Sequence, residues 1–252
     1  MLSASVLYLI SIVVLKAVAP QLKLDGFSKL YNFSQIILCG YMTWGFFENG
    51  FTLDNPFASN MKATSEIEWF MFVHYLSKFL DFFDTWIMIF KRNFRQLSFL
   101  HVYHHSSILL IWGYLLQRDQ AIGTAYFGAF LNSIVHFVMY SHYLWTSFGF
   151  NNPFKKWITN MQLIQFFLCI AHAVYSLVYE EVLDRELAYL QFAYHLTMIA
   201  LFSNFYMNTY GQLTTPFHTC TCCFYISKLT FFLSLCPGKK GEKGEKGAKK
   251  TE

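Results

Sequence analysis

The sequence predicts an all-α, polytopic membrane protein, and its composition supports that fold class in three ways. Of its 252 residues, 55% are hydrophobic and 20% aromatic, while only 13% are charged. An ordinary soluble domain is about 25% charged. A water-facing fold of this size could not bury so much apolar surface, and the long uncharged runs point to lipid as the solvent. The formal net charge of +4 is small, so nucleic acid is not an expected partner.

Seven stretches of the chain are long and apolar enough to cross a bilayer as helices. A hydrocarbon core about 30 Å thick requires about 20 helical residues, and backbone in lipid must satisfy its own hydrogen bonds. The segments between the stretches are short and polar, so no soluble domain is expected among them. The seven predicted spans are Leu2–Ala19, Leu30–Phe47, Ile67–Phe90, Ser98–Leu116, Ile122–Trp145, Ile158–Tyr179 and Leu187–Tyr210.

The first stretch could instead be a cleaved signal peptide, because Ala17-Val18-Ala19 resembles a cleavage site. Its first residues carry no positive charge, however, and Pro20 follows directly. We therefore expect this stretch to be retained as a membrane span.

Basic residues are unevenly divided between alternate connecting segments, which predicts the orientation in the membrane. One set of connections carries seven Lys and Arg residues and the other carries three. The richer side is predicted to be cytosolic, so the N-terminus is lumenal and the C-terminus cytosolic. The seven are Lys23, Lys29, Lys91, Arg92, Arg95, Lys155 and Lys156, and the three are Lys62, Arg118 and Arg185.

The C-terminal part of the chain is expected to lie on the cytosolic side. We divide the chain into a seven-helix domain (1–212), an apolar juxtamembrane segment (213–236) that is cytosolic or interfacial, and a disordered tail (237–252) rich in Lys, Gly and Glu. The ending Lys249-Lys250-Thr251-Glu252 resembles a dilysine retrieval signal. Residence in the endoplasmic reticulum membrane is therefore predicted.

The six cysteines do not indicate a disulfide framework. Cys39 and Cys169 lie inside predicted spans and are expected to pack as small hydrophobic residues. Zinc binding, palmitoylation and no role at all stay open for the C-terminal cluster. That cluster comprises Cys220, Cys222, Cys223 and Cys236.

Polar side chains inside the predicted spans are the main functional signal, because a charge within a bilayer costs about 2.5 kcal/mol or more. In the third span, Lys78, Asp81 and Thr85 fall within about 60° of one another around the helix. Asp84 lies off that face. A structural ion pair between Lys78 and Asp81 is the alternative explanation for their presence.

Three further spans carry polar stripes. His101, His104 and His105 span about 100° of a helix, and three titratable rings on one face serve no packing need. For Gln162 and Gln165, hydrogen bonding to neighbouring helices is an equally good explanation. The stripe of the fifth span comprises Asn132, His136, Met139, Tyr140 and Tyr143.

Three other histidines, His74, His172 and His195, are isolated on apolar helices. We expect them to be packed residues rather than participants in chemistry. They are therefore left out of the predicted site.

Four motifs in these spans resemble those of the ELO family of fatty-acid elongases, in family order and over about Leu2–Tyr210. Asp81 stands where the family has Glu, His142 stands where it has Tyr, and Gln96 resembles members that elongate polyunsaturated chains. The four motifs are Lys78-Phe-Leu-Asp81-Phe-Phe-Asp84-Thr85, the histidine box His101-Val-Tyr-His104-His105, Asn132-Ser-Ile-Val-His136-Phe-Val-Met139-Tyr140-Ser-His142-Tyr143 and Thr159-Asn-Met-Gln162-Leu-Ile-Gln165.

The resemblance implies the condensing enzyme of the microsomal elongation cycle, with seven transmembrane helices enclosing an acyl-chain tunnel. Such an enzyme condenses an acyl-CoA with malonyl-CoA, releases CO2 and CoA, and forms a 3-oxoacyl-CoA two carbons longer. No cofactor and no metal are implied. The implied partners are the lipid bilayer and the ketoreductase, dehydratase and enoyl reductase of the cycle, and a homodimer is left open.

This chemistry requires a nucleophile and a stabiliser for the enolate. Neither in-span cysteine lies beside a histidine in the sequence, so we expect His104 to attack the thioester and form an acyl-imidazole. An apolar cavity would protect that intermediate from water. His101, His105 or Asp84 would fix the tautomer of His104.

The remaining motif residues are expected to bind substrate. Asn132 and His136 would polarise the malonyl thioester, with His136 as a potential proton relay. The CoA phosphates are expected at the cytosolic basic residues Lys91, Arg92, Arg95, Lys155 and Lys156. The other predicted substrate-binding residues are Lys78, Asp81, Thr85, Met139, Tyr140, Tyr143, Gln162 and Gln165.

Two other functions are alternatives. Di-iron membrane desaturases and hydroxylases also use His-x-x-His-His, but an iron pair needs about eight imidazole or carboxylate ligands, and the sequence holds one such box. A transporter or seven-helix receptor can also line a path with polar residues. Broken spans would be expected there, and the motif-bearing spans contain no Pro.

Overall fold

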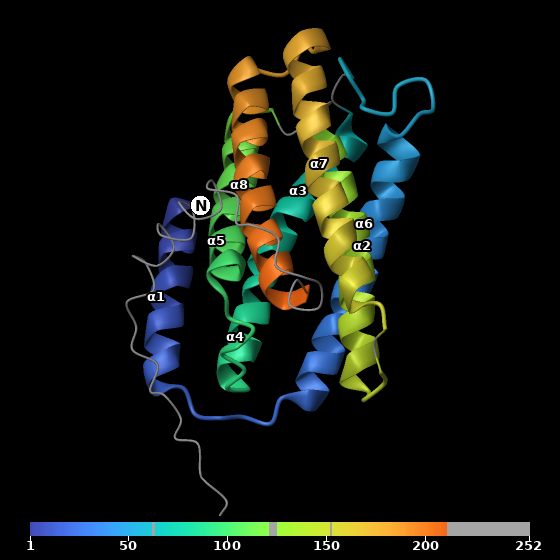
Figure 1. Cartoon of the computed structure of the whole chain (residues 1–252). Helices are drawn as coiled ribbons and strands as arrows, with labels where there is room; N and C mark the ends of the chain where they lie inside the picture. Colours follow the sequence, from blue (N-terminus) through green and yellow to red (C-terminus); the bar gives the residue numbers. More distant parts are fainter. Residues whose placement is uncertain (62–63, 121–124, 152, 211–252) are drawn as a thin grey trace, which may run out of the picture. The chain divides into compact units, whose positions relative to one another are not determined.

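The regular structure in the described part of the chain is α-helical throughout, which confirms the all-α prediction. The computed structural model describes residues 1–61, 64–120, 125–151 and 153–210. Residues Met1–Tyr206 form one compact unit, whose helices are drawn in Figure 1. The helices are α1 (Leu2–Val18), α2 (Asp25–Gly50), α3 (Ser65–Leu80), α4 (Phe82–Phe90), α5 (Phe99–Gln117), α6 (Tyr126–Ser147), α7 (Lys155–Tyr179) and α8 (Arg185–Tyr210).

Several expectations concern residues outside the described ranges. They are the juxtamembrane segment 213–236, the tail 237–252 with Lys249 and Lys250, and the cysteine cluster from Cys220 to Cys236. The basic residue Lys62 also lies outside these ranges. All of these expectations stay predictions.

Each predicted span coincides with a helix, but the third is divided in two. One helix is expected over Ile67–Phe90, whereas α3 ends at Leu80 and α4 begins at Phe82. At Asp81 the chain makes a tighter turn, in which the Asp84 N–H donates to the Asp81 carbonyl three residues back (3.3 Å). The expectation of one continuous helix is therefore wrong. The break falls where the Asp81 side chain meets polar groups on other helices.

Length and apolar character single out one membrane-spanning helix among the described residues. Helix α7 has 25 residues and a mean hydropathy of 1.7 over its most apolar window. Helix α1 is apolar but only 17 residues long. Helices α3 and α4 are shorter still, and α2, α5, α6 and α8 contain no equally long stretch that is as apolar and as free of charge. The helical architecture is thus established, while seven crossings and a tunnel stay proposals.

The helices of the compact unit pack so that their polar motifs face one another. Helix α2 lies along α6 and α3, α7 packs on α6, and α1 lies against α4 and α5. The interior between α2, α3 and α6 is filled by large side chains such as Met42, Phe46, Met71 and Tyr126, all almost fully buried. A smaller cluster joins α1 to α4, where the Tyr8 ring of α1 stacks on the ring of the first phenylalanine of α4.

Several of the basic residues counted for orientation meet at one end of this unit. The Lys91 ammonium after α4 lies 2.7 Å from the Asp25 carboxylate at the start of α2, and it holds the pKa of that carboxyl below its usual range. Arg92 donates to the Ala19 carbonyl after α1 (2.6 Å), and the Lys29 ammonium lies over the ring of Phe148 after α6 (4.5 Å). The connections after α1, α4 and α6 therefore share one end of the unit.

Gly45 on α2 is the point where the Phe70 ring of α3 lies directly against the helix backbone. A methyl group at position 45 would overlap that ring, which is 6% exposed and cannot swing outward freely. We predict that Gly45→Ala lowers the free energy of unfolding by about 1–3 kcal/mol, the usual cost of overpacking a core. Thermal unfolding of the purified protein in detergent measures it.

Gly26→Ala is the matched control, because a methyl group there meets nothing within 4 Å. Equal unfolding temperatures for the two variants would contradict the prediction.

Candidate functional site

A buried ammonium group organises the polar interior. Lys78 of α3 is 2% exposed, and its Nζ atom lies 3.1 Å from Asp81 Oδ2 and 2.9 Å from Asn132 Oδ1. An ammonium group only donates hydrogen bonds, so Asn132 must present its carbonyl oxygen to Lys78. The two N–H bonds of the Asn132 amide are therefore directed elsewhere. Lys78 and Asp81 therefore form the ion pair given above as the alternative explanation for their presence, and α6 takes part in it through Asn132.

The second carboxylate of the motif enters the same network through a tyrosine. Tyr140 of α6 donates to Asp84 Oδ2 (2.6 Å) and approaches Asp81 Oδ1 (3.2 Å). Two residues of α2 complete the arrangement, because Gln35 Nε2 donates to Asp81 Oδ1 (3.2 Å) and to the Tyr31 hydroxyl (2.9 Å). Tyr140 is therefore a hydrogen-bond partner of both Asp84 and Asp81, although the two carboxylates lie on different faces of a helical wheel.

The histidine box lies at the start of α5 with its rings close together. His101 and His105 have ring centroids 4.0 Å apart, and His104 and His105 have centroids 5.6 Å apart. His101 Nε2 lies 2.7 Å from Thr85 Oγ1, which in turn lies 2.8 Å from the Tyr8 hydroxyl of α1. The box is thus anchored to α4 and α1 through its first ring.

His104 has its own partner on α8. Its Nδ1 atom lies 3.0 Å from the hydroxyl of Tyr194, a residue that is 7% exposed. No hydrogen bond described here joins His104 to His101, His105 or Asp84, the three residues expected to orient it. Tyr194 takes that place instead.

The stripe predicted on α6 is largely buried. Asn132 and His136 are each 8% exposed and Tyr140 is fully buried, whereas Tyr143 at the end of the stripe is 42% exposed. The His136 ring lies edge-on to Tyr140, with centroids 5.7 Å apart. The structure therefore joins the inner part of the stripe to the acidic network and leaves Tyr143 at its margin.

The motif on α7 joins the same interior. Gln165 is buried, and Gln162 donates from Nε2 to the sulfur of Met139 (3.7 Å). Hydrogen bonding between neighbouring helices, the alternative explanation for these glutamines, therefore holds for Gln162.

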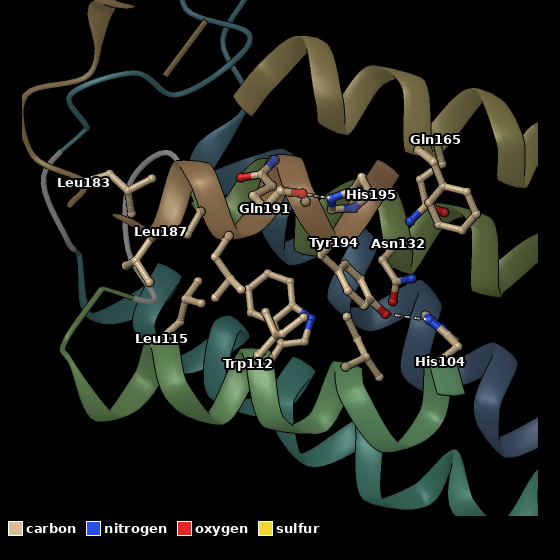
Figure 2. Close-up of a pocket in the computed structure, with 16 residues that line it drawn as sticks. His104, Trp112, Leu115, Asn132, Gln165, Leu183, Leu187, Gln191, Tyr194 and His195 are labelled. Carbon is tan, nitrogen blue, oxygen red and sulfur yellow. Dashed lines mark hydrogen bonds between the residues drawn. The ribbon is translucent and has the colours of Figure 1, made fainter. Parts of the chain in front are cut away.

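A cavity of about 60 Å3 lies between α5, α6, α7 and α8. Figure 2 shows its two ends to be chemically different. Polar side chains gather at one end, where the dashed line joins His104 to Tyr194, and aliphatic side chains line the other. The polar end has His104, Asn132, Gln165, Tyr194 and His195, and the apolar end has Leu115, Leu183 and Leu187.

The basic residues expected to hold CoA phosphates do not line this cavity. Lys91 and Arg92 contact Asp25 and Ala19 at the end of the unit described above. The Lys156 ammonium lies over the Tyr206 ring (5.8 Å), near the beginning of α7. Lys155 is exposed at the same helix end, and Arg95 is exposed after α4.

One of the histidines expected to be only packed lines the cavity. His195 lies beside Tyr194, and its Nδ1 atom is 2.7 Å from the Gln191 carbonyl oxygen. His74 and His172 do behave as packed residues, against Trp112 (4.8 Å between centroids) and Phe127 (4.6 Å) respectively.

Three polar residues of α8 line the cavity but are not among the site residues predicted from the sequence. Gln191, Tyr194 and His195 recur at helical spacing and all line the cavity. That spacing within an apolar span is the signal that could have identified them.

Within the described ranges, no group of three or more His, Cys, Asp or Glu side chains is placed to hold a metal ion. The described cysteines, Cys39 and Cys169, are buried free thiols. Neither is among the residues that line the cavity.

Comparison with known proteins gives consistent matches. The model of the ELO family, described as GNS1/SUR4, matches residues 1–217. The chain is 42% identical over 213 residues to fatty acid elongase 5 of Trypanosoma cruzi (strain CL Brener), covering 82% of each chain. It is 43% identical over 213 residues to fatty acid elongase 4 of Trypanosoma brucei brucei, again covering 82% of each. Very long chain fatty acid elongase 5 of Homo sapiens is 38% identical over 157 residues, covering 61% of this chain and 51% of that protein.

The buried pair of Lys78 and Asp81 provides a stability test. Lys78→Met leaves the Asp81 carboxylate, 3% exposed, without its cation. Removing one partner of a buried ion pair costs about 3–5 kcal/mol. We predict a loss of this size in the free energy of unfolding in detergent.

Lys91→Met removes the cation of the solvent-exposed pair with Asp25 and serves as the control, with an expected cost of about 0–1 kcal/mol. A loss for Lys78→Met no larger than that of the control would contradict the assignment.

Proposed function

The chain belongs to the ELO (GNS1/SUR4) family of fatty acid elongases, and from this premise we propose that it is the condensing enzyme of fatty-acid elongation. It would join a long-chain acyl-CoA to malonyl-CoA, release CO2 and CoA, and form a 3-oxoacyl-CoA two carbons longer. The observation that supports this proposal most strongly is the cavity, which has His104 at its polar end and aliphatic side chains along its other end. A fatty acyl thioester has the same division, with a polar reacting group and an apolar chain.

His104 is proposed to carry the acyl group. Among the described residues that line the cavity, the side chains able to act as nucleophiles are those of His104, His195 and Tyr194, and a neutral imidazole is a stronger nucleophile than a neutral phenol. His104 lies beside the imidazole of His105, which in turn lies beside that of His101, whereas the rings described beside His195 are those of Phe166 and Tyr194. Attack by His104 on the thioester would form an acyl-imidazole, and the apolar surroundings would slow its hydrolysis.

Asn132 is proposed to stabilise the enolate of malonyl-CoA. Lys78 fixes the direction of the Asn132 amide by taking its oxygen, so the amide N–H bonds of this cavity residue are the ones available to a substrate oxygen. His136, buried on the same face of α6, is proposed to assist by moving a proton. Asp81 and Thr85 are proposed to act indirectly, through Lys78 and His101.

The acyl chain is proposed to extend from His104 toward Leu183 and Leu187. A cavity of about 60 Å3 holds only a few water-sized molecules, so a long chain requires the surrounding side chains to move apart. Polyunsaturated chains are the proposed substrates, on the support of Gln96 and the residues that follow it before the histidine box.

We place this chemistry in the endoplasmic reticulum membrane. The family consists of membrane proteins, and the end of the unit carrying Lys29, Lys91 and Arg92 is proposed to face the cytosol and receive CoA, with the N-terminus lumenal. The reaction as proposed needs no cofactor or metal. Its product requires a ketoreductase, a dehydratase and an enoyl reductase as partners in the cycle, and a homodimer is a further proposal.

The proposed reaction has a direct test. Purified protein incubated with an acyl-CoA and malonyl-CoA should form the 3-oxoacyl-CoA, and activity should persist in chelator. His104→Ala should lower turnover by about 10^4-fold or more, as loss of a nucleophile does, with unchanged abundance and unfolding temperature.

His142→Ala is the matched control, because it removes an imidazole of α6 that does not line the cavity. Wild-type turnover in the His104 variant, or stoichiometric iron with activity lost in chelator, would contradict the proposal.

Occupation of the cavity by the acyl chain gives a second test. Gly128 lines the cavity, and a side chain there would grow toward Trp112, which lies 3.9 Å from the position of its first carbon. Gly128→Leu should lower kcat/KM for a long-chain acyl-CoA by about 10-fold or more, because misfit of even small groups costs this much. The same variant should retain activity with a shorter acyl-CoA, which serves as its internal control. Equal losses with both substrates would place the chain elsewhere.

A further inference from the structure

The orientation of His104 depends on a residue outside the four motifs. Two of the three residues first expected to orient it have other partners, because His101 bonds to Thr85 and Asp84 bonds to Tyr140. No hydrogen bond described for the third, His105, reaches His104. The group that does reach His104 is the Tyr194 hydroxyl, 3.0 Å from Nδ1. Tyr194 lines the same cavity and is 7% exposed. Figure 2 shows this contact at the polar end, with Asn132 nearby.

We propose that Tyr194 is a catalytic residue that both orients His104 for attack and donates a hydrogen bond to the oxygen of the reacting thioester. This inference rests on the proposed function, because it assumes that His104 attacks an acyl-CoA. It goes further by assigning the tautomer of His104 and a role for α8.

The assignment follows from counting hydrogens. Nδ1 of His104 is occupied by Tyr194, so the nitrogen left to attack is Nε2. A neutral imidazole has a lone pair on Nε2 only when its hydrogen is on Nδ1. The Nδ1–H must then donate to the Tyr194 oxygen. The hydroxyl hydrogen of Tyr194 is consequently not taken by His104. Ser107 of α5 also contacts this hydroxyl, so in the proposed reaction the hydrogen turns from Ser107 to the thioester carbonyl, which would lie at the same polar end of the cavity.

The acylation step balances with these two groups. Nε2 of His104 forms a bond to the acyl carbon, and the carbonyl oxygen gains negative charge that the Tyr194 O–H stabilises. The oxygen then restores its double bond, the carbon–sulfur bond breaks, and CoA leaves as a thiolate that takes its proton from water. His104 keeps the hydrogen on Nδ1, so the carrier is a positively charged acyl-imidazolium.

The condensation step follows from the same arrangement. A phenol hydroxyl accepts the Nδ1–H without removing it, because neutral phenol is a far weaker base than imidazole. When the malonyl carboxylate leaves as CO2, the enolate carbon bonds to the acyl carbon and the carbon–nitrogen bond breaks. The leaving group is neutral imidazole, so His104 returns to its starting tautomer without an added proton.

The test compares two tyrosines that join the same pair of helices. Tyr194→Phe removes the hydroxyl at His104, and Tyr103→Phe removes a hydroxyl of α5 that contacts Thr197 of α8 (2.9 Å) at an exposed position. The rings of Tyr103 and Tyr194 stack on each other, with centroids 6.4 Å apart. Tyr194→Phe should lower kcat by about 10^2- to 10^3-fold, the usual effect of losing one oxyanion donor, with little change in KM for acyl-CoA. Tyr103→Phe should match the wild type.

A second readout isolates the acylation step. Mixing wild-type protein with acyl-CoA alone should release CoA in a rapid burst of about one per protein, and Tyr194→Phe should slow that burst as much as it slows turnover. A wild-type burst in the Tyr194 variant would overturn the role, as would equal slowing by Tyr103→Phe. Product formation by the wild type without any burst would overturn the inference and leave condensation standing. Absence of product from the wild type would overturn the proposed function itself.

The tautomer can be measured without any change at Tyr194. Nitrogen-15 spectra of histidine-labelled protein, with the His104 signals identified by their absence in His104→Gln, should show the hydrogen on Nδ1. A hydrogen on Nε2 would overturn the inference even if Tyr194→Phe failed to fold.

Discussion

The interior depends on the burial of one ammonium group. An isolated charge inside a protein costs several kcal/mol, so Lys78 must have partners, and it takes one on its own helix and one on α6. The Asp81 carboxylate in turn accepts hydrogen bonds from Gln35 of α2 and from Tyr140 of α6. Three helices are thereby held at fixed positions around a single charge. The turn between α3 and α4 falls at this carboxylate, which directs Thr85 of α4 toward the histidine box.

The same interaction prepares the chemistry that we propose. Lys78 fixes the orientation of the Asn132 amide, and Asn132 lines the cavity at the same polar end as His104. Groups held in place before the substrate arrives need no reorganisation during the reaction, which is the main source of electrostatic catalysis. The apolar end of the cavity supplies the other requirement, since it excludes water from an intermediate that water would destroy. The Lys78 ammonium, which lies outside the cavity, thus supports the proposed site. The described residues that line the cavity include no Lys, Arg, Asp or Glu.

The sequence was sufficient to predict the helices and many of the polar residues that meet inside them. The pair Lys78 and Asp81 lies three residues apart on one helix, and the box histidines share one face, so both follow from helical geometry alone. The contact between Tyr140 and Asp84, the place of Tyr194 beside His104, and the exposure of Tyr143 could not be predicted in this way. Each depends on which helix packs opposite which, and the periodicity of one helix carries no information about its neighbour.

The identity of the acylated residue is the central claim, and mass spectrometry of the protein after brief incubation with an acyl-CoA alone tests it most directly. Proteolysis and fragmentation should place the acyl group on His104 rather than on His101 or His105 of the same peptide, and later addition of malonyl-CoA should remove it with formation of the 3-oxoacyl product. An acyl group on Cys39 or Cys169, or an unmodified protein that still forms product, would contradict the claim.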